Sequence, residues 1–229
     1  MEEPVLRRLH VDTRQLFLKP ARRWQENPDG TFSYPVTLQE GPNTISVIAT
    51  DLAGNQASDT RTVTLDQDAP VITITLPADN MKTKQSPLDV TGSIDDPSTV
   101  TVKVNGGNAA PAVMNGNSFS LSITPVYGMN TIEVTATDLA GNTAAAKRTV
   151  TFDDRNPSLS VTDPPQDVKT NQAAITIKGE TSDLTAVTVT LTMDGNIYTP
   201  AVADGKFQQP VTFTAEKTYT IYVKAVDEV

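Results

Sequence analysis

The sequence predicts an all-β fold made of tandem, antiparallel β-sandwiches arranged end to end. One observation is a phrase, Asn-Thr-Ile-x-Val-x-Ala-Thr-Asp-Leu-Ala-Gly-Asn, that occupies residues 43–55 and returns 87 residues later at 130–142. Self-similarity at a fixed period is typical of a modular array. The other observation is that apolar and polar residues alternate along short segments, as half-buried strands require.

Other landmarks keep the period of the phrase. They are Pro70 and Pro157, and the phenylalanines Phe32, Phe119 and Phe207. A third, altered copy of the phrase begins at Tyr219 and runs to the end of the chain. We therefore expect a module of about 87 residues, with roughly two and a half modules in the 229 residues.

Alternating apolar positions place the strands of the middle module. In chain order they are Ile72, Ile74 and Leu76; Leu88 and Val90; Val100, Val102 and Val104; Phe119, Leu121 and Ile123; Ile132, Val134 and Ala136; and Val150 and Phe152. Turn signals rich in Asn, Gly, Asp and Pro separate these segments. About seven short strands in under 90 residues, without helical periodicity, predict an immunoglobulin-like sandwich.

The Asp-Leu-Ala-Gly-Asn end of the phrase is interpreted as a hairpin loop between the last two strands of a module. Gly54 and Gly141 would supply the positive φ angle that short hairpins need. Asp51 and Asp138 would accept hydrogen bonds from backbone N–H groups two or three residues later. The phrase is therefore predicted to be a folding device and not a catalytic or binding site.

Composition and spacing predict four segments. Residues 1–24 form an atypical basic segment, interpreted as non-native; 25–66 form the C-terminal part of an incomplete module; 67–153 form a complete module; and 154–229 form a module without its last strand. Proline restricts its own φ angle and the backbone of the residue before it. The junctions that contain Pro70 and Pro157 are therefore expected to be short and stiff. We expect the chain to be a piece of a longer protein.

The charge of the chain excludes some classes of partner. A net charge of −9 argues against nucleic acid, because that affinity comes largely from Lys and Arg on phosphates. Basic residues are concentrated in residues 1–24, which contain six Lys and Arg but only three Asp and Glu. No apolar run approaches the roughly 18 residues of a membrane-spanning helix, so no membrane insertion is expected.

The chain also lacks the residues that most catalytic sites need. His10 is the only histidine and cysteine is absent, which excludes most nucleophilic triads. Carboxylate pairs such as Asp95 and Asp96 occupy predicted turns, where Asp is favoured for conformational reasons. We predict no enzyme activity, no catalytic residues and no cofactor-binding residues. Only 5% of the residues are aromatic, which leaves little surface for stacking on sugar rings.

The stretch from Phe32 to Asn55, which contains Glu40-Gly41-x-Asn43 and Asp51-x-Ala53-Gly54-Asn55, resembles bacterial immunoglobulin-like repeats of large surface adhesins. It is also similar to domain B of glucodextranase-type enzymes. The second copy, from Phe119 to Asn142, matches it, whereas in the third copy Glu216-Lys217-Thr218-Tyr219 replaces the Gly-x-Asn turn. The resemblance covers about residues 27–229.

The resemblance implies a non-catalytic structural spacer of a secreted or cell-surface bacterial protein, with a role related to adhesion. Its partners would be other modules of the same full-length chain and a surface receptor or glycan. The alternative is an accessory domain of a polysaccharide-degrading enzyme, which would present or bind carbohydrate.

Calcium is the one metal that the resemblance suggests, because some adhesin arrays stiffen their linkers with Ca²⁺. The candidate ligands are Asp66 and Asp68 at the first junction, and Asp153 and Asp154 at the second. Calcium takes six to eight oxygen ligands, so two carboxylates would need backbone carbonyls and waters as well. The competing interpretation is that these aspartates solvate the linkers and cap turns.

Overall fold

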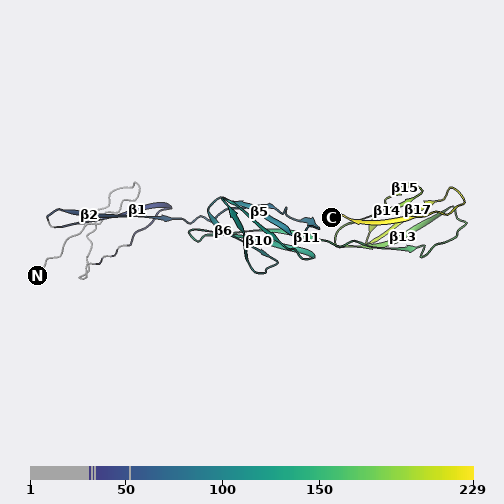
Figure 1. Cartoon of the computed structure of the whole chain (residues 1–229), viewed down its shortest axis with the longest axis horizontal. Helices are drawn as coiled ribbons and strands as arrows, with labels where there is room; N and C mark the ends of the chain where they lie inside the picture. The colour runs from purple at the N-terminus through teal and green to yellow at the C-terminus, as the bar shows by residue number, and fades with distance from the viewer. Residues whose placement is uncertain (1–30, 32, 34, 52) are drawn as a thin grey trace. The chain divides into compact units, whose positions relative to one another are not determined.

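A computed structural model describes residues 31, 33, 35–51 and 53–229 (Figure 1). All regular structure in this part of the chain is β-strand, which confirms the predicted all-β class. The chain divides into two compact units: residues up to Pro70 together with Thr137–Thr143, and Val71–Ala136 together with Ala144–Val229. Among the described residues no helix is long and apolar enough to cross a membrane.

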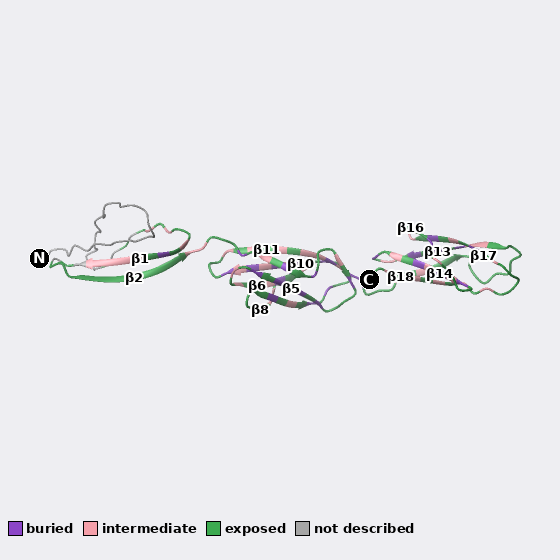
Figure 2. Cartoon of the chain, turned by 90° about the horizontal axis from the view of Figure 1, so that it is seen from above, coloured by how far each residue is buried: buried purple, intermediate pink, exposed green. Residues whose placement is uncertain are grey.

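Among the described residues up to Pro70, the regular structure is one long hairpin. Strand β1 (Gly41–Thr50) pairs in antiparallel register with β2 (Gln56–Leu65), from Gly41 opposite Leu65 to Thr50 opposite Gln56. Strand β2 is exposed along almost its whole length (Figure 2). The basic segment 1–24 and Phe32 lie outside the described residues.

The middle sandwich contains nine strands in two sheets. They are β3 (Ile72–Leu76), β4 (Met81–Thr83), β5 (Leu88–Ile94), β6 (Ser98–Val104), β7 (Ala110–Pro111), β8 (Val113–Asn115), β9 (Ser118–Ile123), β10 (Gly128–Asp138) and β11 (Thr143–Phe152). One sheet has the order β3-β5-β9-β8 and the other the order β4-β11-β10-β6-β7. The sequence predicted about seven strands; β4, β7 and β8 are two or three residues long, too short to show a period-two pattern.

The core of this sandwich follows the predicted alternation, with one exception. Its buried side chains are Ile74, Leu88, Val90, Ile94, Val100, Val102, Phe119, Ile123, Ile132, Val134, Ala136 and Val150. Leu76 was predicted to point inward and is instead 50% exposed. The register between β3 and β5 shifts between Ile74 and Leu76. A bulge at this point turns the following side chain to the other face of the sheet, which local alternation cannot predict.

The third sandwich has the same construction with fewer strands. They are β12 (Ser158–Asp163), β13 (Ala174–Ser182), β14 (Val187–Met193), β15 (Asn196–Tyr198), β16 (Val202–Ala203), β17 (Lys206–Thr212) and β18 (Tyr222–Asp227). The sheets are β12-β13-β17-β16 and β15-β14-β18. The core comprises Ile177, Val189, Leu191, Met193, Phe207 and Val211. In sheet order β18 matches β10, because β18 pairs with β14 as β10 pairs with β6, and β14 follows β6 by one repeat period.

A phenylalanine stacked over a glycine recurs in both sandwiches. Phe119 lies directly across from Gly92 in the β5–β9 pair, and Phe207 lies across from Gly179 in the β13–β17 pair. Both rings are at most 3% exposed. Each ring occupies the space that a side chain at its glycine would fill. The period of 87 residues relates the two glycines, and the two phenylalanines keep it to within one residue, so the sequence repeat contains this pairing.

Candidate functional site

The residues that recur from module to module are the first candidates for a site, and Asn130 opens the second copy of the phrase. Its side chain is fully buried. The Oδ1 atom accepts a hydrogen bond from the backbone N–H of Val126 (2.9 Å), and Nδ2 donates to the carbonyl of the same residue (2.7 Å). Nδ2 also donates to the carbonyl of Gly128 (3.0 Å). The side chain therefore holds the turn that precedes β10.

Asn43 makes the same contacts at the start of the first copy. Its Oδ1 accepts from the N–H of Gln39 (2.8 Å), and Nδ2 donates to the carbonyls of Gln39 (2.7 Å) and Gly41 (2.8 Å). The partner is again the residue four positions earlier. The recurrence of this asparagine is thus explained by backbone groups that need partners.

Tyr219 takes the place of this asparagine in the third copy. Its hydroxyl accepts from the N–H of Ala215 (2.9 Å) and donates to the carbonyl of Ala215 (3.1 Å), again four residues earlier. It also accepts from the N–H of Thr214 (3.0 Å). A tyrosine whose hydroxyl binds backbone a few residues upstream is a known device of immunoglobulin-like sandwiches. The altered sequence of this copy therefore keeps the same function in the turn.

The other end of the phrase forms the predicted hairpin loop. Asp51 Oδ1 accepts from the N–H groups of Ala53 (2.9 Å) and Asn55 (2.8 Å), and Asp138 Oδ1 accepts from those of Gly141 (2.7 Å) and Asn142 (2.8 Å). The φ angles of Gly54 and Gly141 are +90° and +99°, as predicted. The side chains of Asn55 and Asn142, at the end of each copy, donate from Nδ2 to the Oδ2 atom of the same aspartate.

These hydrogen bonds change the acidity of both carboxyl groups. The pKa of Asp51 is lowered from its ordinary value of 3.8, mainly by the side chain of Asn55 and then by backbone N–H groups. Burial raises the pKa of Asp138, but the side chain of Asn142 and three backbone N–H groups together outweigh it, so this pKa is also lowered. The ionised form is thus favoured in the folded state.

We predict that protonation of Asp138 destabilises the middle sandwich in acid. Because its pKa is lower in the folded than in the unfolded state, the stabilisation is present above about pH 4 and disappears as the pH falls through the folded value. Urea unfolding at pH 7 and pH 3 should show that Asp138→Asn is less stable at pH 7 and loses less on acidification. Asp89→Asn, at an exposed position on β5, is the control and should keep the wild-type pH dependence. An Asp138→Asn variant as acid-sensitive as the wild type would contradict the assignment.

Of the predicted calcium ligands at the first junction, Asp66 is partly buried and Asp68 is exposed. Asp66 Oδ1 accepts a hydrogen bond from the N–H of Asp68 (3.1 Å), as in a capped turn. A carboxylate oxygen of Asp66 lies within 4.8 Å of one of Asp138, and the backbone carbonyl of Asp66 accepts from Asn142 Nδ2 (3.1 Å). The sequence left open whether the hairpin loop of Asp138 lies near this junction or at the far end of the module.

The two candidates at the second junction have opposite environments. Asp153 is 2% exposed, whereas the adjacent Asp154 is exposed to solvent. Asp153 Oδ1 accepts from the N–H of Arg155 (3.3 Å), and Oδ2 accepts from the hydroxyl of Thr185 (3.2 Å). Asp68, Asp153 and Asp154 belong to no group of three or more metal-ligating side chains among the described residues. Calcium binding at either junction stays a prediction.

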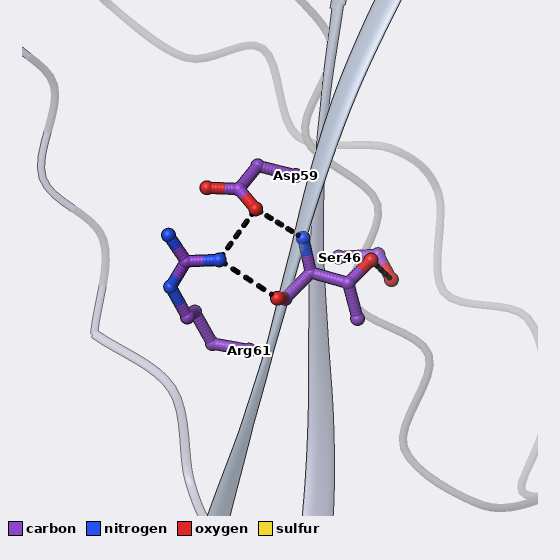
Figure 3. Close-up of polar contacts among 4 residues, drawn as sticks. Ser46, Asp59 and Arg61 are labelled. Atoms are coloured by element: carbon purple, nitrogen blue, oxygen red, sulfur yellow. Dashed lines mark hydrogen bonds and ion pairs between the residues drawn. The ribbon is translucent and has the colours of Figure 1, made fainter.

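Strands β1 and β2 carry a further polar cluster, which does not recur as a unit (Figure 3). Arg61 contacts Asp59 (2.5 Å), and Ser46 lies within 3.1 Å of the hydroxyl of Thr60. Both charged side chains are about two-thirds exposed or more, so the ion pair contributes little to stability. Charged side chains on an exposed strand do keep it from pairing with other chains, which explains them without a ligand.

An open groove of about 680 Å³ on the third sandwich was not predicted. Its polar lining includes Ser160, Glu180, Asp183, Asp204 and Lys206, and no aromatic side chain contributes to it. Asp183 Oδ2 is buried there without a hydrogen-bond partner, whereas Oδ1 accepts from the N–H of Leu184 (2.8 Å). Glu180 is paired with Lys206 (3.7 Å). No sequence signal marks this groove, because its walls come from strands up to about 50 residues apart.

A family model described as "Glucodextranase, domain B" matches residues 18–67, 70–154 and 157–229, which confirms the resemblance found in the sequence. Bacillopeptidase F of Bacillus subtilis (strain 168) is 37% identical over 150 residues, which are 65% of this chain and 10% of that protein. The PII-type proteinase of Lacticaseibacillus paracasei is 39% identical over 70 residues, 31% of this chain and 4% of that protein. The chain thus spans a tenth or less of the length of these relatives.

Among solved structures, the tetra-tandem repeat in the extending region of a large adhesion protein covers 90% of this chain. The match covers 59% of that chain, with 22% sequence identity and a TM-score of 0.37.

Proposed function

Because the chain belongs to the glucodextranase domain B family, we propose that its modules serve as a non-catalytic structural spacer in a secreted or cell-surface bacterial protein. The carrying observation is that the polar residues of the repeated phrase hydrogen-bond to the backbone of their own turns. Asn43, Asn130 and Tyr219 bind the turn before a strand, and Asp51 and Asp138 bind the turn after it. The recurrence of these residues is therefore explained by their role in stabilising the fold, and it gives no evidence for a repeated ligand site.

The relatives support placement in a larger chain. Two proteinases contain segments like this one, and these segments are 10% and 4% of their lengths. The described residues contain neither histidine nor cysteine, because His10 lies outside them and the chain has no cysteine. A segment of this kind would hold a catalytic or binding domain, encoded elsewhere in the full chain, at a distance from the cell surface or from the rest of the protein.

A second candidate function is an accessory domain that binds carbohydrate for a polysaccharide-degrading enzyme. The groove on the third sandwich favours it, because Ser, Asp, Glu and Lys side chains can hydrogen-bond to hydroxyl groups. The absence of an aromatic side chain from this lining weighs against it, since sugar rings commonly stack on aromatic faces. The spacer is therefore the function that we put first.

Small-angle X-ray scattering tests the spacer directly. A compact globule of 229 residues would have a radius of gyration of about 17 Å by the usual scaling. Sandwiches joined end to end should give roughly 30 Å, from strands that rise about 3.4 Å per residue. We expect the larger value in EDTA. A value near the smaller one would mean that the modules pack together, and the spacer function would be wrong.

The same measurement with millimolar Ca²⁺ addresses the predicted metal. Extracellular modules bind calcium in a range of roughly 10⁻⁴ to 10⁻³ M, so millimolar Ca²⁺ would occupy a site of this kind. A profile that becomes more extended with Ca²⁺, and that no longer responds after Asp66→Asn, would support a metal at the first junction. A profile indifferent to Ca²⁺ would leave a spacer without metal.

A further inference from the structure

The contacts around residues 153–157, which connect β11 to β12 and are called the second joint here, suggest how this spacer resists bending. We propose that direct side-chain contacts lock the second joint and that the lock requires no metal ion. The proposal goes beyond the spacer function, because it concerns the rigidity of one joint. It does not depend on which catalytic or binding domain the spacer carries. Apart from Thr137–Thr143, both sandwiches that meet at this joint belong to the same compact unit.

Asp153 forms the central contact of the joint. It directly follows β11, and its N–H donates to the carbonyl of Thr83 (3.0 Å), which anchors it to the middle sandwich. Its Oδ2 atom accepts from the hydroxyl of Thr185, in the segment before β14 of the third sandwich. Both residues are at least 92% buried. A buried carboxylate that loses its partner is costly, so this bond favours one arrangement of the two sandwiches.

A second contact connects the sandwiches at a different point. Lys82 on β4 forms an ion pair with Glu228, next to the end of β18. Glu228 also accepts from the N–H of Ala186 (3.1 Å), beside Thr185. The bond from Lys82 and the N–H of Ala186 lower the pKa of Glu228, which keeps it ionised. Both charged side chains are more than a third exposed, so this pair contributes less free energy than the buried bond of Asp153. Its main effect is to restrict how the two sandwiches are oriented.

The connecting segment itself is attached to the middle sandwich. The guanidinium group of Arg155 lies 3.7 Å from the ring centroid of Tyr127, in the loop before β10. A cation over an aromatic face at this distance is attractive. Pro157 restricts the backbone immediately before β12. The two side-chain contacts between the sandwiches, together with a linker held on the middle sandwich, restrict both tilt and rotation, whereas a single contact would permit pivoting.

The geometry of Asp153 also explains why no metal is needed here. Each of its two carboxylate oxygens already accepts a hydrogen bond, and the side chain is almost inaccessible to solvent. A calcium ion needs six to eight oxygen ligands, which would require this buried group to open toward water. Asp154 is exposed but is a single carboxylate. The locked joint and a calcium site at Asp153 therefore exclude each other.

Distances between two spin labels on the full chain test the lock. The chain has no cysteine, so Lys103→Cys on β6 and Gln208→Cys on β17, both at exposed positions, can be labelled without interference. We expect one narrow distance distribution in EDTA, unchanged by Ca²⁺. Thr185→Val keeps the shape of the side chain and removes the hydroxyl, and Asp153→Ala removes the carboxylate. Both should cause loss of the single narrow peak.

Asp154→Ala is the matched control, because it removes the adjacent carboxylate, which is exposed to solvent. It should leave the narrow peak intact. Lys82→Met should broaden the peak less than Thr185→Val.

A broad distribution in EDTA for the unmodified joint would overturn the proposal, and so would one that narrows only when Ca²⁺ is added. A narrow peak that survives Thr185→Val and Asp153→Ala would show that these residues do not form the lock. An amide NMR spectrum of each variant verifies that the third sandwich is folded, because the signals of β14 should then match those of the unmodified chain.

Discussion

Replacement of Gly92 by alanine is expected to destabilise the middle sandwich by about 3 kcal/mol, at the upper end of what overpacking costs. A β-carbon at this position would lie 2.2 Å from the carbonyl oxygen of Thr73 and 2.5 Å from the ring of Phe119. The ring is 2% exposed and lies in the core, so it has no space into which it can move. The carbonyl belongs to the paired strand β3, so its movement would disturb the β3–β5 pairing.

Chemical denaturation measures this effect, with amide signals of the middle and third sandwiches followed separately. Ser93→Ala, at the exposed neighbouring position, is the control and should stay within about 0.5 kcal/mol of the wild type. Gly92→Ala combined with Phe119→Leu should recover part of the loss, because the ring clash is relieved and the clash with the Thr73 carbonyl remains. Gly179→Ala should act in the same way on the third sandwich. A Gly92→Ala variant as stable as the control would show that the close packing is not required.

Replacement of Asn130 by alanine is expected to cost about 3 kcal/mol. The substitution removes the hydrogen bonds to the N–H and the carbonyl of Val126, and each such bond contributes about 1 kcal/mol. It also removes the bond to the carbonyl of Gly128. Because Asn130 is fully buried, water cannot replace these contacts without opening the turn before β10.

Thermal and urea unfolding of Asn130→Ala measure this loss, and Thr131→Ala at the adjacent exposed position is the control. Tyr219→Phe provides the matching test in the third sandwich. It removes only the hydroxyl that binds Ala215 and Thr214, and it should cost about 1 kcal/mol because the ring stays packed on Phe213. If Tyr219→Phe had no effect, the view that tyrosine replaces asparagine in this turn would be wrong.

Local patterns predicted the class of fold and the position of the longer strands. Period-two alternation depends on neighbours two residues apart, and it located the buried faces of β5, β6, β9 and β10. Leu76 was placed wrongly because a bulge depends on how β3 meets β5, which no local pattern records. The domain boundaries 1–24, 25–66, 67–153 and 154–229 stay a prediction.

The candidate site divides in the same way between local and distant contacts. The hairpin loops were predicted with their acceptors and their positive φ angles, because every partner of Asp51 and Asp138 there lies within four residues. The difference between Asp153 and Asp154 was not predicted, because the partner of Asp153 is 32 residues away. Both were equal candidates for a metal in the sequence, and only the packing of the third sandwich separates them.

The sequence by itself therefore determined the repeat, the strand faces and the hairpin turns of this protein, because each depends on residues close together in the chain. Only the tertiary structure decided that Tyr219 binds the same turn as Asn130, and which aspartate becomes buried at the second joint. These features depend on strand register and on contacts between elements that are far apart in the chain. Such contacts form only when the sheets pack, so no local pattern can encode them.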